Sequence, residues 1–257
     1  MKTRTTLLVL FAALLFIGTS CEKSIFPIRG NGDVATETRS VSGFNKVENE
    51  GQFDVYIIQS DEYSVTIEAE SNLIGRIRTR MNGSILEIDT KDNLKPSSPM
   101  KLYIYTPDMN GVKLSGSGII DLGEVITDEL DVRLSGSGDI RGSVDADDVY
   151  IGISGSGTAN LSMYCNTIET DVSGSGDMYF NGMANTAYFN ISGSGAVRAY
   201  DFELQKCSAK ISGSGDMFVN VSEHLNVTIS GSGSVYYIGY PSINTNISGS
   251  GNVISKN

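Results

Sequence analysis

The residues best placed to do chemistry in this 257-residue chain are carboxylates that follow a repeated Ser-Gly-Ser-Gly tetrapeptide. Asp139, Asp177 and Asp216 each stand directly after one copy. Glycine-aspartate patterns hold calcium in β-rolls with a nine-residue repeat, whereas the repeat here is about 19 residues long. Five of the eight copies have no acidic residue at that position, so the ladder of oxygen ligands would be incomplete. We therefore expect no metal site.

A single histidine, His224, limits the catalytic chemistry that the chain can carry. It excludes a histidine metal triad, and its place beside Glu223 in a polar stretch predicts a solvated loop residue. Asp145, Asp147 and Asp148 fall where a turn between repeats is expected, and such clusters usually face solvent. We predict a protein that is not an enzyme and has no cofactor. The alternative is a carbohydrate-active enzyme, which would need two carboxylates at a fixed separation in a cleft.

Aromatic residues are the candidates for binding a ligand. The position six residues after the first serine of each copy holds Asp121, Arg141, Asn160, Tyr179, Arg198, Phe218, Tyr236 and Ile254. Strand alternation points this position outward, so Tyr179, Phe218 and Tyr236 would form a partly aromatic strip that can stack on a glycan or dock a protein. In the opposing interpretation, the alternation slips near a corner and these side chains pack inward.

The elements that position these residues follow from the spacing of the tetrapeptide. Its copies begin at Ser115, Ser135, Ser154, Ser173, Ser192, Ser212, Ser230 and Ser248. This nearly constant interval indicates stacked, nearly identical units. Each unit has room for two or three short strands and none for a helix.

Aliphatic residues recur at fixed places around each copy. Those directly before it are Leu114, Leu134, Ile153, Val172, Ile191, Ile211, Ile229 and Ile247. Further apolar columns alternate with polar positions, which indicates strands with one buried face. We predict an all-β fold, a β-solenoid of about eight short coils in which like strands stack in parallel about 4.8 Å apart.

The Ser-Gly-Ser-Gly tetrapeptide itself needs a physical reason, because glycine is costly in a strand unless a side chain cannot fit or the backbone bends. We infer a corner or a thin part of the coil, where facing walls come close and the serines form hydroxyl ladders outside. We interpret it as a folding element. The alternative is a flat Ser/Gly face that binds a ligand.

Two cysteines lie within the repeats. Cys165 shares a column with Ala146 and Ala184, whereas Cys207 belongs to an aliphatic column two coils further along. That separation, about 10 Å by stacking alone, exceeds disulfide reach. We predict two buried free thiols.

The N-terminal segment, residues 1–20, differs in kind from the rest. Lys2 and Arg4 precede an apolar run over residues 7–17, which is too short to span a bilayer. Small residues then precede Cys21, a pattern similar to a bacterial lipoprotein signal although Gly18 replaces the usual leucine-like residue. We predict cleavage before Cys21 and a lipid on its thiol, which supplies membrane contact. An ordinary secretory signal is the alternative, and either way the protein is exported.

The net charge bounds the partners of the exported protein. Removing residues 1–20 would remove two basic residues and no acidic one, so the formal charge of −11 would become more negative by two. Nucleic acid and bare anionic membrane surface should repel such a chain, and we expect no nucleic-acid partner.

The chain divides into four predicted parts. Residues 1–20 are the signal peptide, residues 21–33 the lipidated cysteine and a tether, residues 34–111 a β-rich N-terminal cap, and residues 112–257 the solenoid. The cap shows alternating segments at 53–58 and 63–69, a turn signal at Asn82-Gly83, and one or two helical turns within 72–80. A cap is needed because the end of a solenoid exposes strand edges whose backbone N–H and C=O groups are unpaired. At the other end Lys256 is the only nearby charge, which makes this end a candidate self-association surface, and the alternative is a terminal coil shielded by its own loops.

Residues 51–69, 72–74, 82–86 and the repeats from 114 to 253 together resemble the head GIN domain family. Its members are described as putative auto-transporter adhesins and are common in Bacteroidetes. The resemblance covers roughly residues 41–255 and implies a right-handed β-helix-like fold and an envelope location, with no catalytic residues. We predict a non-catalytic adhesin-like binding module or scaffold, an outer-membrane lipoprotein with a glycan or protein ligand.

Overall fold

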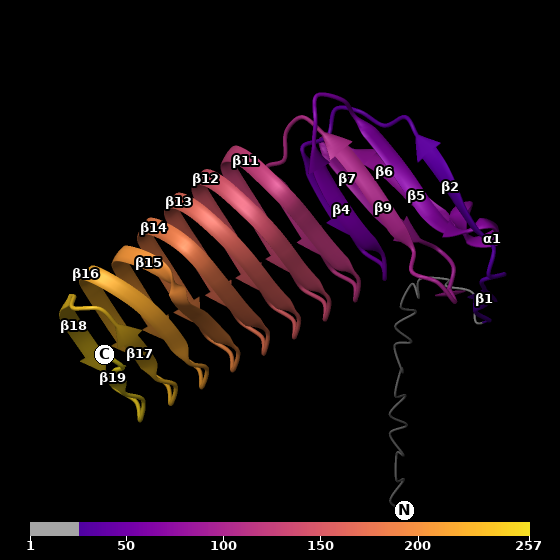
Figure 1. The fold of residues 1–257 in the computed structure, drawn as a ribbon. Helices are drawn as coiled ribbons and strands as arrows, with labels where there is room; N and C mark the ends of the chain where they lie inside the picture. The colour runs from indigo at the N-terminus through magenta and orange to yellow at the C-terminus, as the bar shows by residue number, and fades with distance from the viewer. Residues whose placement is uncertain (1–25) are drawn as a thin grey trace, which may run out of the picture.

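The structure is a computed structural model that describes residues 26–257. The predicted signal peptide and Cys21 lie outside the described residues. Figure 1 shows a row of long strands that lie side by side, with a second group of strands at the N-terminal end of the row. The strands of the row are β10 (Gly111–Leu114), β11 (Ile119–Leu134), β12 (Asp139–Ile153), β13 (Thr158–Val172), β14 (Asp177–Ile191), β15 (Ala196–Ile211), β16 (Met217–Ile229), β17 (Val235–Ile238), β18 (Ser242–Ile247) and β19 (Val253–Ser255).

Every hydrogen-bonded strand pair in this row is parallel, and the pairing aligns equivalent positions of successive repeats. The aliphatic residue before each Ser-Gly-Ser-Gly pairs with its equivalent in the next coil, from Leu114 opposite Leu134 through to Ile229 opposite Ile247. The first seven members of this column are buried. Ile247, in the last coil described, is 42% exposed because no further described coil covers it. The predicted all-β solenoid with a continuous apolar interior is therefore confirmed.

Each coil bends at defined places along its strand. In β12 the alternation of buried and exposed residues breaks near Gly142, whose φ is +145°, and again at Asp147, which the register with β13 skips. The residues equivalent to Asp147 form a side-chain ladder, in which Asn185 donates to Asn166 and Gln205 donates to Asn185 at 2.8 and 3.0 Å. These hydrogen bonds join successive coils along one corner.

The Ser-Gly-Ser-Gly segments form the remaining corner, and the turns lie along one edge of the row in Figure 1. A Cβ atom on Gly136 would lie 1.9 Å from the carbonyl oxygen of Gly116, and one on Gly155 would lie 1.9 Å from that of Gly136. The backbone of the preceding coil therefore excludes a side chain. Our inference of a corner holds, but the crowding comes from the neighbouring coil and not from a facing wall.

The serines of these corners are exposed in all eight copies. Within residues 26–257 no hydrogen bond joins one of their hydroxyl groups to the next, so the predicted hydroxyl ladders are not formed. The backbone makes the ladder instead, with the Ser135 and Ser137 amides donating to the Leu114 and Gly116 carbonyls at 2.9 and 3.2 Å.

The parallel stacking continues into the segment that we predicted to be a cap. The strands β3 (Lys46–Asn49) and β4 (Asp54–Gln59) pair in parallel with β10 and β11. The next layer outward is β7 (Ile85–Thr90) and β9 (Lys101–Thr106), also parallel. The strands β7 and β9, which come later in the sequence than β3 and β4, thus lie further from the repeat coils. The hydrogen-bond ladder between strands continues across the boundary that we predicted at residue 111. That boundary therefore marks where the sequence repeat begins, and it stays a prediction.

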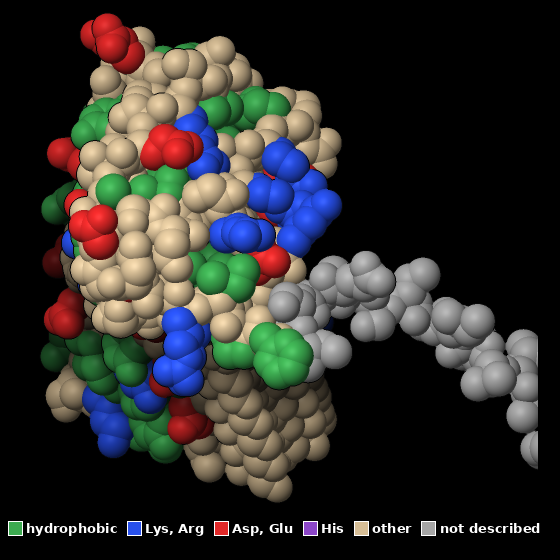
Figure 2. All heavy atoms as spheres, turned by 90° about the vertical axis from the view of Figure 1, so that its right-hand side faces the viewer, with side chains coloured by type: hydrophobic (Ala, Val, Ile, Leu, Met, Phe, Trp, Pro, Cys, Tyr) green, Lys and Arg blue, Asp and Glu red, His purple; other side chains and the backbone are tan. Residues whose placement is uncertain are grey.

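Antiparallel strands cover this end of the stack. They are β6 (Ile77–Asn82) on β7, β5 (Ser64–Glu70) on β9, and β2 (Val34–Arg39) on β5. The helical turn expected within 72–80 is α1 (Ser71–Ile74), one turn long, and β6 follows it. Figure 2 looks onto this end and shows a larger group of Lys and Arg side chains on one side, with further basic side chains spread over the rest of the face.

The described part of the predicted tether is docked onto the cap. Strand β1 (Ile28–Arg29) pairs with β8 (Leu94–Lys95), and the buried carboxylate of Glu70 accepts hydrogen bonds from Gly32 and Ser97. The Ser97 hydroxyl makes the leading contribution that lowers the pKa of Glu70. One carboxylate thus ties three segments together.

Both cysteines in the repeats are free thiols in the predicted columns. Cys207 is buried, whereas Cys165 is only half-buried, because it lies where β13 approaches a corner. Burial raises the pKa of each thiol to about 12. At the far end, β18 is exposed along its whole length, and the self-association surface expected there stays a prediction.

Candidate functional site

The predicted aromatic strip lies on the outer surface of the solenoid. Register places Asn160 opposite Tyr179, Tyr179 opposite Arg198, Arg198 opposite Phe218, and Phe218 opposite Tyr236. Tyr179 is 38% exposed, and Phe218 and Tyr236 are half-buried. The alternative in which these side chains pack inward is thus not what the structure has.

The rings of this column are stacked along the solenoid. The Arg198 guanidinium lies 5.1 Å from the Tyr179 ring centre and 5.8 Å from that of Phe218. Phe218 and Tyr236 are stacked with centres 5.0 Å apart and planes 9° apart, and the Lys256 ammonium lies 5.3 Å from the Tyr236 ring. Because neighbours occupy most ring faces, the strip offers ring edges to solvent more than faces.

A change in coil length opens a hollow beside this column. The interval from Ser192 to Ser212 is longer than the next one, from Ser212 to Ser230. The register of β15 on β16 accordingly jumps from Ala199 opposite Val219 to Glu203 opposite Asn220. The residues between Ala199 and Glu203 are skipped by the β16 ladder, although the Asn220 side chain of β16 donates to the Tyr200 carbonyl at 3.3 Å, and Tyr200 and Asp201 form one wall of the hollow.

This hollow, which we call the Arg198 hollow, has a volume of about 460 Å³. Its lining residues are Asn160, Tyr179, Phe180, Asn181, Arg198, Tyr200, Asp201 and Phe218. Tyr236 does not line it and instead supports Phe218 from behind. Of the three residues that the sequence singled out, the structure brings Tyr179 and Phe218 together around one cavity.

Arg198 is the electrostatic centre of the Arg198 hollow. Its Nη1 atom lies 3.1 Å from Asp177 Oδ2 and is buried, but the pair lacks hydrogen-bond geometry. The other Asp177 oxygen accepts the Ala196 amide at 2.9 Å, which fixes the carboxylate. The Tyr200 ring meets Phe218 edge-on at 5.6 Å, and burial is the main cause that raises the pKa of Tyr200. These groups are held by strands and are therefore pre-positioned.

The chemistry that this arrangement supports is binding through hydrogen bonds and apolar contact. Arg198 and the amides of Asn160 and Asn181 can donate, whereas Asp201 can accept. Tyr179 and Phe218 add apolar surface. Small-ligand sites typically combine an apolar lining with a few placed polar groups in this way.

Two of the three aspartates that follow Ser-Gly-Ser-Gly have backbone partners in the next coil. Asp177 Oδ1 accepts the amide of Ala196, and Asp216 Oδ1 accepts that of Ser234 at 2.7 Å. Each therefore satisfies a backbone group of the next coil. Asp139 is exposed. Among the described residues there is no group of three or more His, Cys, Asp or Glu side chains suited to hold a metal ion.

The acidic cluster lies on the solvent side of β12, as predicted, with Asp145, Asp147 and Asp148 all exposed. Asp148 lines a shallow hollow of about 390 Å³ together with Glu129 and Glu169, which are also exposed. A general acid at neutral pH usually needs burial to raise its pKa, and these three carboxylates are not buried.

His224 is exposed, as expected, but the prediction of a loop was wrong. It lies within β16, pairs with Ser242 of β18, and its Nδ1 is 2.6 Å from the Ser242 hydroxyl. The polar stretch around it stays a strand because the apolar residues on either side, Val221 and Leu225, are buried in the interior.

Sequence reasoning missed Arg198, Tyr200 and Asp201 as members of the site. The signal was present in the repeat intervals, because the shortening of the interval after Ser212 marks the place where one coil protrudes beyond the next. Unequal coil lengths in a solenoid are therefore worth examining as markers of surface cavities.

Comparison with known proteins gives a consistent result. Residues 43–162 and 142–241 each match the family described as "Putative auto-transporter adhesin, head GIN domain". No curated protein matches the chain. Among the described residues, no helix is long and apolar enough to cross a membrane.

Several crystal structures share the fold. A putative lipid binding protein from Parabacteroides distasonis ATCC 8503 is 25% identical, with a TM-score of 0.86 over 90% of this chain and 100% of its own. A putative adhesin from Parabacteroides merdae ATCC 43184 is 20% identical, with a TM-score of 0.83 over 90% and 99%. A putative adhesin from Parabacteroides distasonis ATCC 8503 is 22% identical, with a TM-score of 0.85 over 90% and 100%.

Proposed function

Because the chain belongs to the head GIN domain family of putative auto-transporter adhesins, we propose that it is a non-catalytic cell-envelope protein that binds a glycan in the Arg198 hollow. The observation that carries this proposal is the cavity of about 460 Å³ between Tyr179, Arg198 and Phe218. Sugars present hydroxyl groups that donate and accept, together with apolar ring faces, and the lining offers partners for both.

Charge favours a neutral glycan over an acidic one. Asp177 and Asp201 offset the charge of Arg198 at the site, and the chain as a whole carries a formal net charge of −11. A carboxylated or sulfated sugar would have to approach against that field. The adhesin descriptions of the family and of two similar structures support ligand binding without naming a ligand, whereas a third similar structure is described as a putative lipid binding protein.

The same proposal includes attachment to the membrane through a lipid on Cys21, with the protein exported and held at the outer membrane. The sequence pattern before Cys21 supports it. Only six residues separate Cys21 from β1, which begins at Ile28 and is docked on the cap. An anchored protein would therefore hold its cap end close to the membrane and extend the later coils away from it.

The test is a glycan array probed with the full-length exported protein and with a Tyr179→Ala variant. We expect retention of neutral glycans and at least about a ten-fold loss of affinity in the variant, because one wall of the cavity is removed. Tyr188→Ala is the matched control, since Tyr188 lies on the same strand β14, is 51% exposed and does not line the hollow.

Two results would contradict the proposal. One is an array on which the folded protein retains no neutral glycan. The other is equal loss of binding in the Tyr179→Ala and Tyr188→Ala variants, which would place the ligand elsewhere on the surface.

A further inference from the structure

One glycine in the solenoid has no backbone reason to be glycine. A Cβ atom on a corner glycine such as Gly155 would strike a backbone oxygen of the preceding coil at 1.9 Å. A Cβ atom on Gly152 would meet only side-chain atoms, namely the ring edge and hydroxyl of Tyr150 at 3.2 Å and Cδ of Arg133 at 3.6 Å. Its φ is not positive. The fold would therefore accept a small side chain at Gly152.

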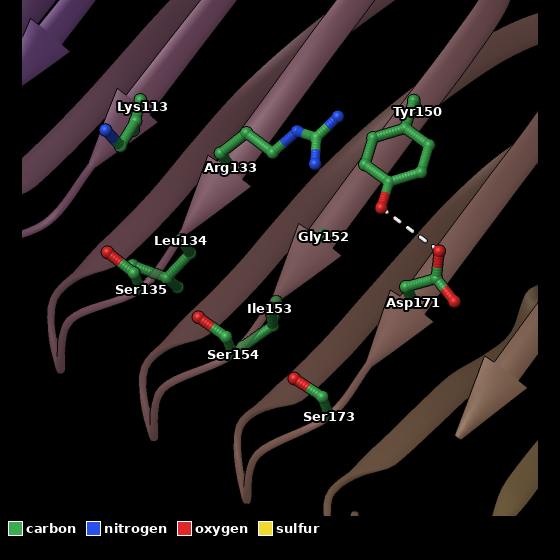
Figure 3. A pocket seen from close by; sticks show the side chains of 10 residues that line it. All are labelled: Lys113, Arg133, Leu134, Ser135, Tyr150, Gly152, Ile153, Ser154, Asp171 and Ser173. Carbon is green, nitrogen blue, oxygen red and sulfur yellow. Dashed lines mark hydrogen bonds between the residues drawn. The ribbon is translucent and has the colours of Figure 1, made fainter. Parts of the chain in front are cut away.

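The absent side chain leaves a gap in an outward column of longer residues. Along this column Lys113, Arg133, Gly152 and Asp171 face one another in successive coils. The gap is a hollow of about 480 Å³, shown in Figure 3 and called here the Gly152 hollow. It is lined by Lys113, Arg133, Leu134, Ser135, Tyr150, Gly152, Ile153, Ser154, Asp171 and Ser173.

The walls of the Gly152 hollow are fixed by a chain of contacts. Arg133 is held by Asp131 at 2.6 Å, and its guanidinium lies 4.1 Å from the centre of the Tyr150 ring. Tyr150 in turn donates to Asp171 at 3.0 Å, as Figure 3 shows, and Asn190 donates to the other Asp171 oxygen at 2.7 Å. Groups that are already ordered lose little conformational freedom when a ligand binds.

Hydroxyl groups without partners line one side of the hollow. Ser135, Ser154 and Ser173 are exposed, stand one coil apart, and lie in a row in Figure 3. Within residues 26–257 their hydroxyl groups make no hydrogen bond. A hydroxyl can both donate and accept, so this row can match the hydroxyl groups of a sugar.

We propose that the Gly152 hollow is a second glycan site, which takes a short linear stretch of neutral oligosaccharide aligned with the stack. Successive coils are about 4.8 Å apart, which is close to the length of one pyranose unit in an extended chain, so each coil would address one sugar. Lys113 and Arg133 are balanced by Glu48 and Asp131, so the site favours an uncharged ligand. The choice of glycan as ligand class rests on the proposed function, whereas the site itself does not.

The site differs in position from the Arg198 hollow. It lies before the Ser-Gly-Ser-Gly corner on β10, β11, β12 and β13, whereas the Arg198 hollow lies after that corner and further along the stack. The two hollows share no lining residue. Two separate sites on one rigid solenoid would raise the avidity for a branched or repetitive glycan surface.

The test is isothermal titration of the full-length protein with neutral linear oligosaccharides of increasing length. We expect affinity to rise with each added sugar up to about four units, the number of coils that the hollow touches, and a Gly152→Leu variant to lose at least ten-fold. Thr228→Leu is the matched control, because Thr228 occupies the same outward column outside the hollow.

A milder variant guards against misfolding of Gly152→Leu. Ser154→Ala removes one hydroxyl group without adding volume and should lose about three-fold, whereas Ser212→Ala, at the equivalent corner outside the hollow, should lose nothing. Unchanged affinity in both Gly152→Leu and Ser154→Ala would overturn this inference, as would binding that does not depend on oligosaccharide length. If Tyr179→Ala alone abolishes binding, the proposed function stands and the second site falls. If only the Gly152 and Ser154 variants lose affinity, the second site stands and the proposed binding in the Arg198 hollow falls.

Discussion

At the scale of the residue, the glycines of this chain have different roles that their sequence context does not separate. Gly155 and Gly152 are three residues apart in neighbouring parts of the same coil. For Gly155 the excluded volume is a carbonyl oxygen of the adjacent coil, whereas for Gly152 it is the edge of a side chain that can move. The first glycine is required for stacking, and the second opens a surface cavity.

This difference gives a prediction about stability. Gly155→Ala should lower the free energy of unfolding by at least about 3 kcal/mol, because a methyl group cannot displace the stacked backbone of the preceding coil. Gly152→Ala should change it by less than about 1 kcal/mol, since Tyr150 needs to shift by only a few tenths of an ångström. Urea denaturation followed by circular dichroism would measure both. Equal effects of the two substitutions would contradict the distinction.

The side chains of the aromatic strip also pack against one another, without any ligand. Phe218 is covered by Tyr236 on one side and approached by Arg198 on the other. The strip that the sequence predicted to bind is therefore partly a stabilising stack. The binding that we propose uses Tyr179 and the cavity beside Phe218.

At the scale of the element, one buried carboxylate joins the segment that follows β1 to the cap, beside a second contact in which the Asn72 side chain donates to the Arg29 carbonyl of β1 at 2.8 Å. Glu70 Oε1 accepts the Gly32 amide at 2.5 Å and the Ser97 hydroxyl at 2.6 Å, while Oε2 accepts the Ser97 amide at 2.8 Å. These three donated hydrogen bonds, led by that of the Ser97 hydroxyl, favour the charged form and lower the pKa of Glu70. The strand itself is only two residues long and could not stay docked by its own pairing.

The lowered pKa of Glu70 fixes the direction of a pH effect. The stabilisation from Glu70 is complete above its unfolded pKa, near 4.5, and is lost as the pH falls through the lower folded pKa. We therefore expect the protection factors of the Gly32 and Ser97 amides against hydrogen exchange to fall as the pH drops below the unfolded pKa of Glu70, before those of the solenoid strands fall. Glu70→Gln should show faster exchange at these amides even at pH 7. Protection of both amides in Glu70→Gln at pH 7 would show that β1 is held by other contacts.

At the scale of the whole molecule, stability comes from one apolar interior that passes through every coil and into the N-terminal strands. The column from Leu114 to Ile229 is buried throughout, and Asn49 continues it into β3 as a buried polar residue. The Asn49 side chain donates to the Phe53 carbonyl and accepts from the Gly51 amide, so it forms the corner that this coil makes without Ser-Gly-Ser-Gly. Each coil therefore supports its neighbours on both sides.

Such an interior makes the cost of a substitution depend on its position in the stack. Ile191→Ala, in a coil covered on both sides, should lower the free energy of unfolding by about 3 kcal/mol. Ile247→Ala, at the equivalent place in the last coil described and 42% exposed, should cost less than about 1 kcal/mol. Thermal or urea unfolding of both variants would measure the difference. Equal costs would show that the last coil is covered by something outside this structure.

Most of the repeat region was predictable from the sequence, although each coil from β11 to β16 is one long bent strand where two or three short strands were predicted. The alternation of Leu134, Ile153 and Val172 with polar neighbours identified the strands, and the interval between copies identified their register. The N-terminal strands were predicted only as a β-rich cap. Their order could not be found, because β7 and β9 lie outside β3 and β4 although they come later in the chain, and no periodic signal relates these segments.

The sequence by itself determined which aliphatic side chains face inward, which columns they form and where the Ser-Gly-Ser-Gly corner lies, because strand alternation and repeat spacing are properties of neighbouring residues along the chain. The tertiary structure alone decided which glycines are excluded by backbone, which ring faces remain free, and that Tyr179, Arg198, Tyr200 and Phe218 surround one cavity. These outcomes depend on which atoms of the next coil come within a few ångströms, and that distance is set only when the coils stack.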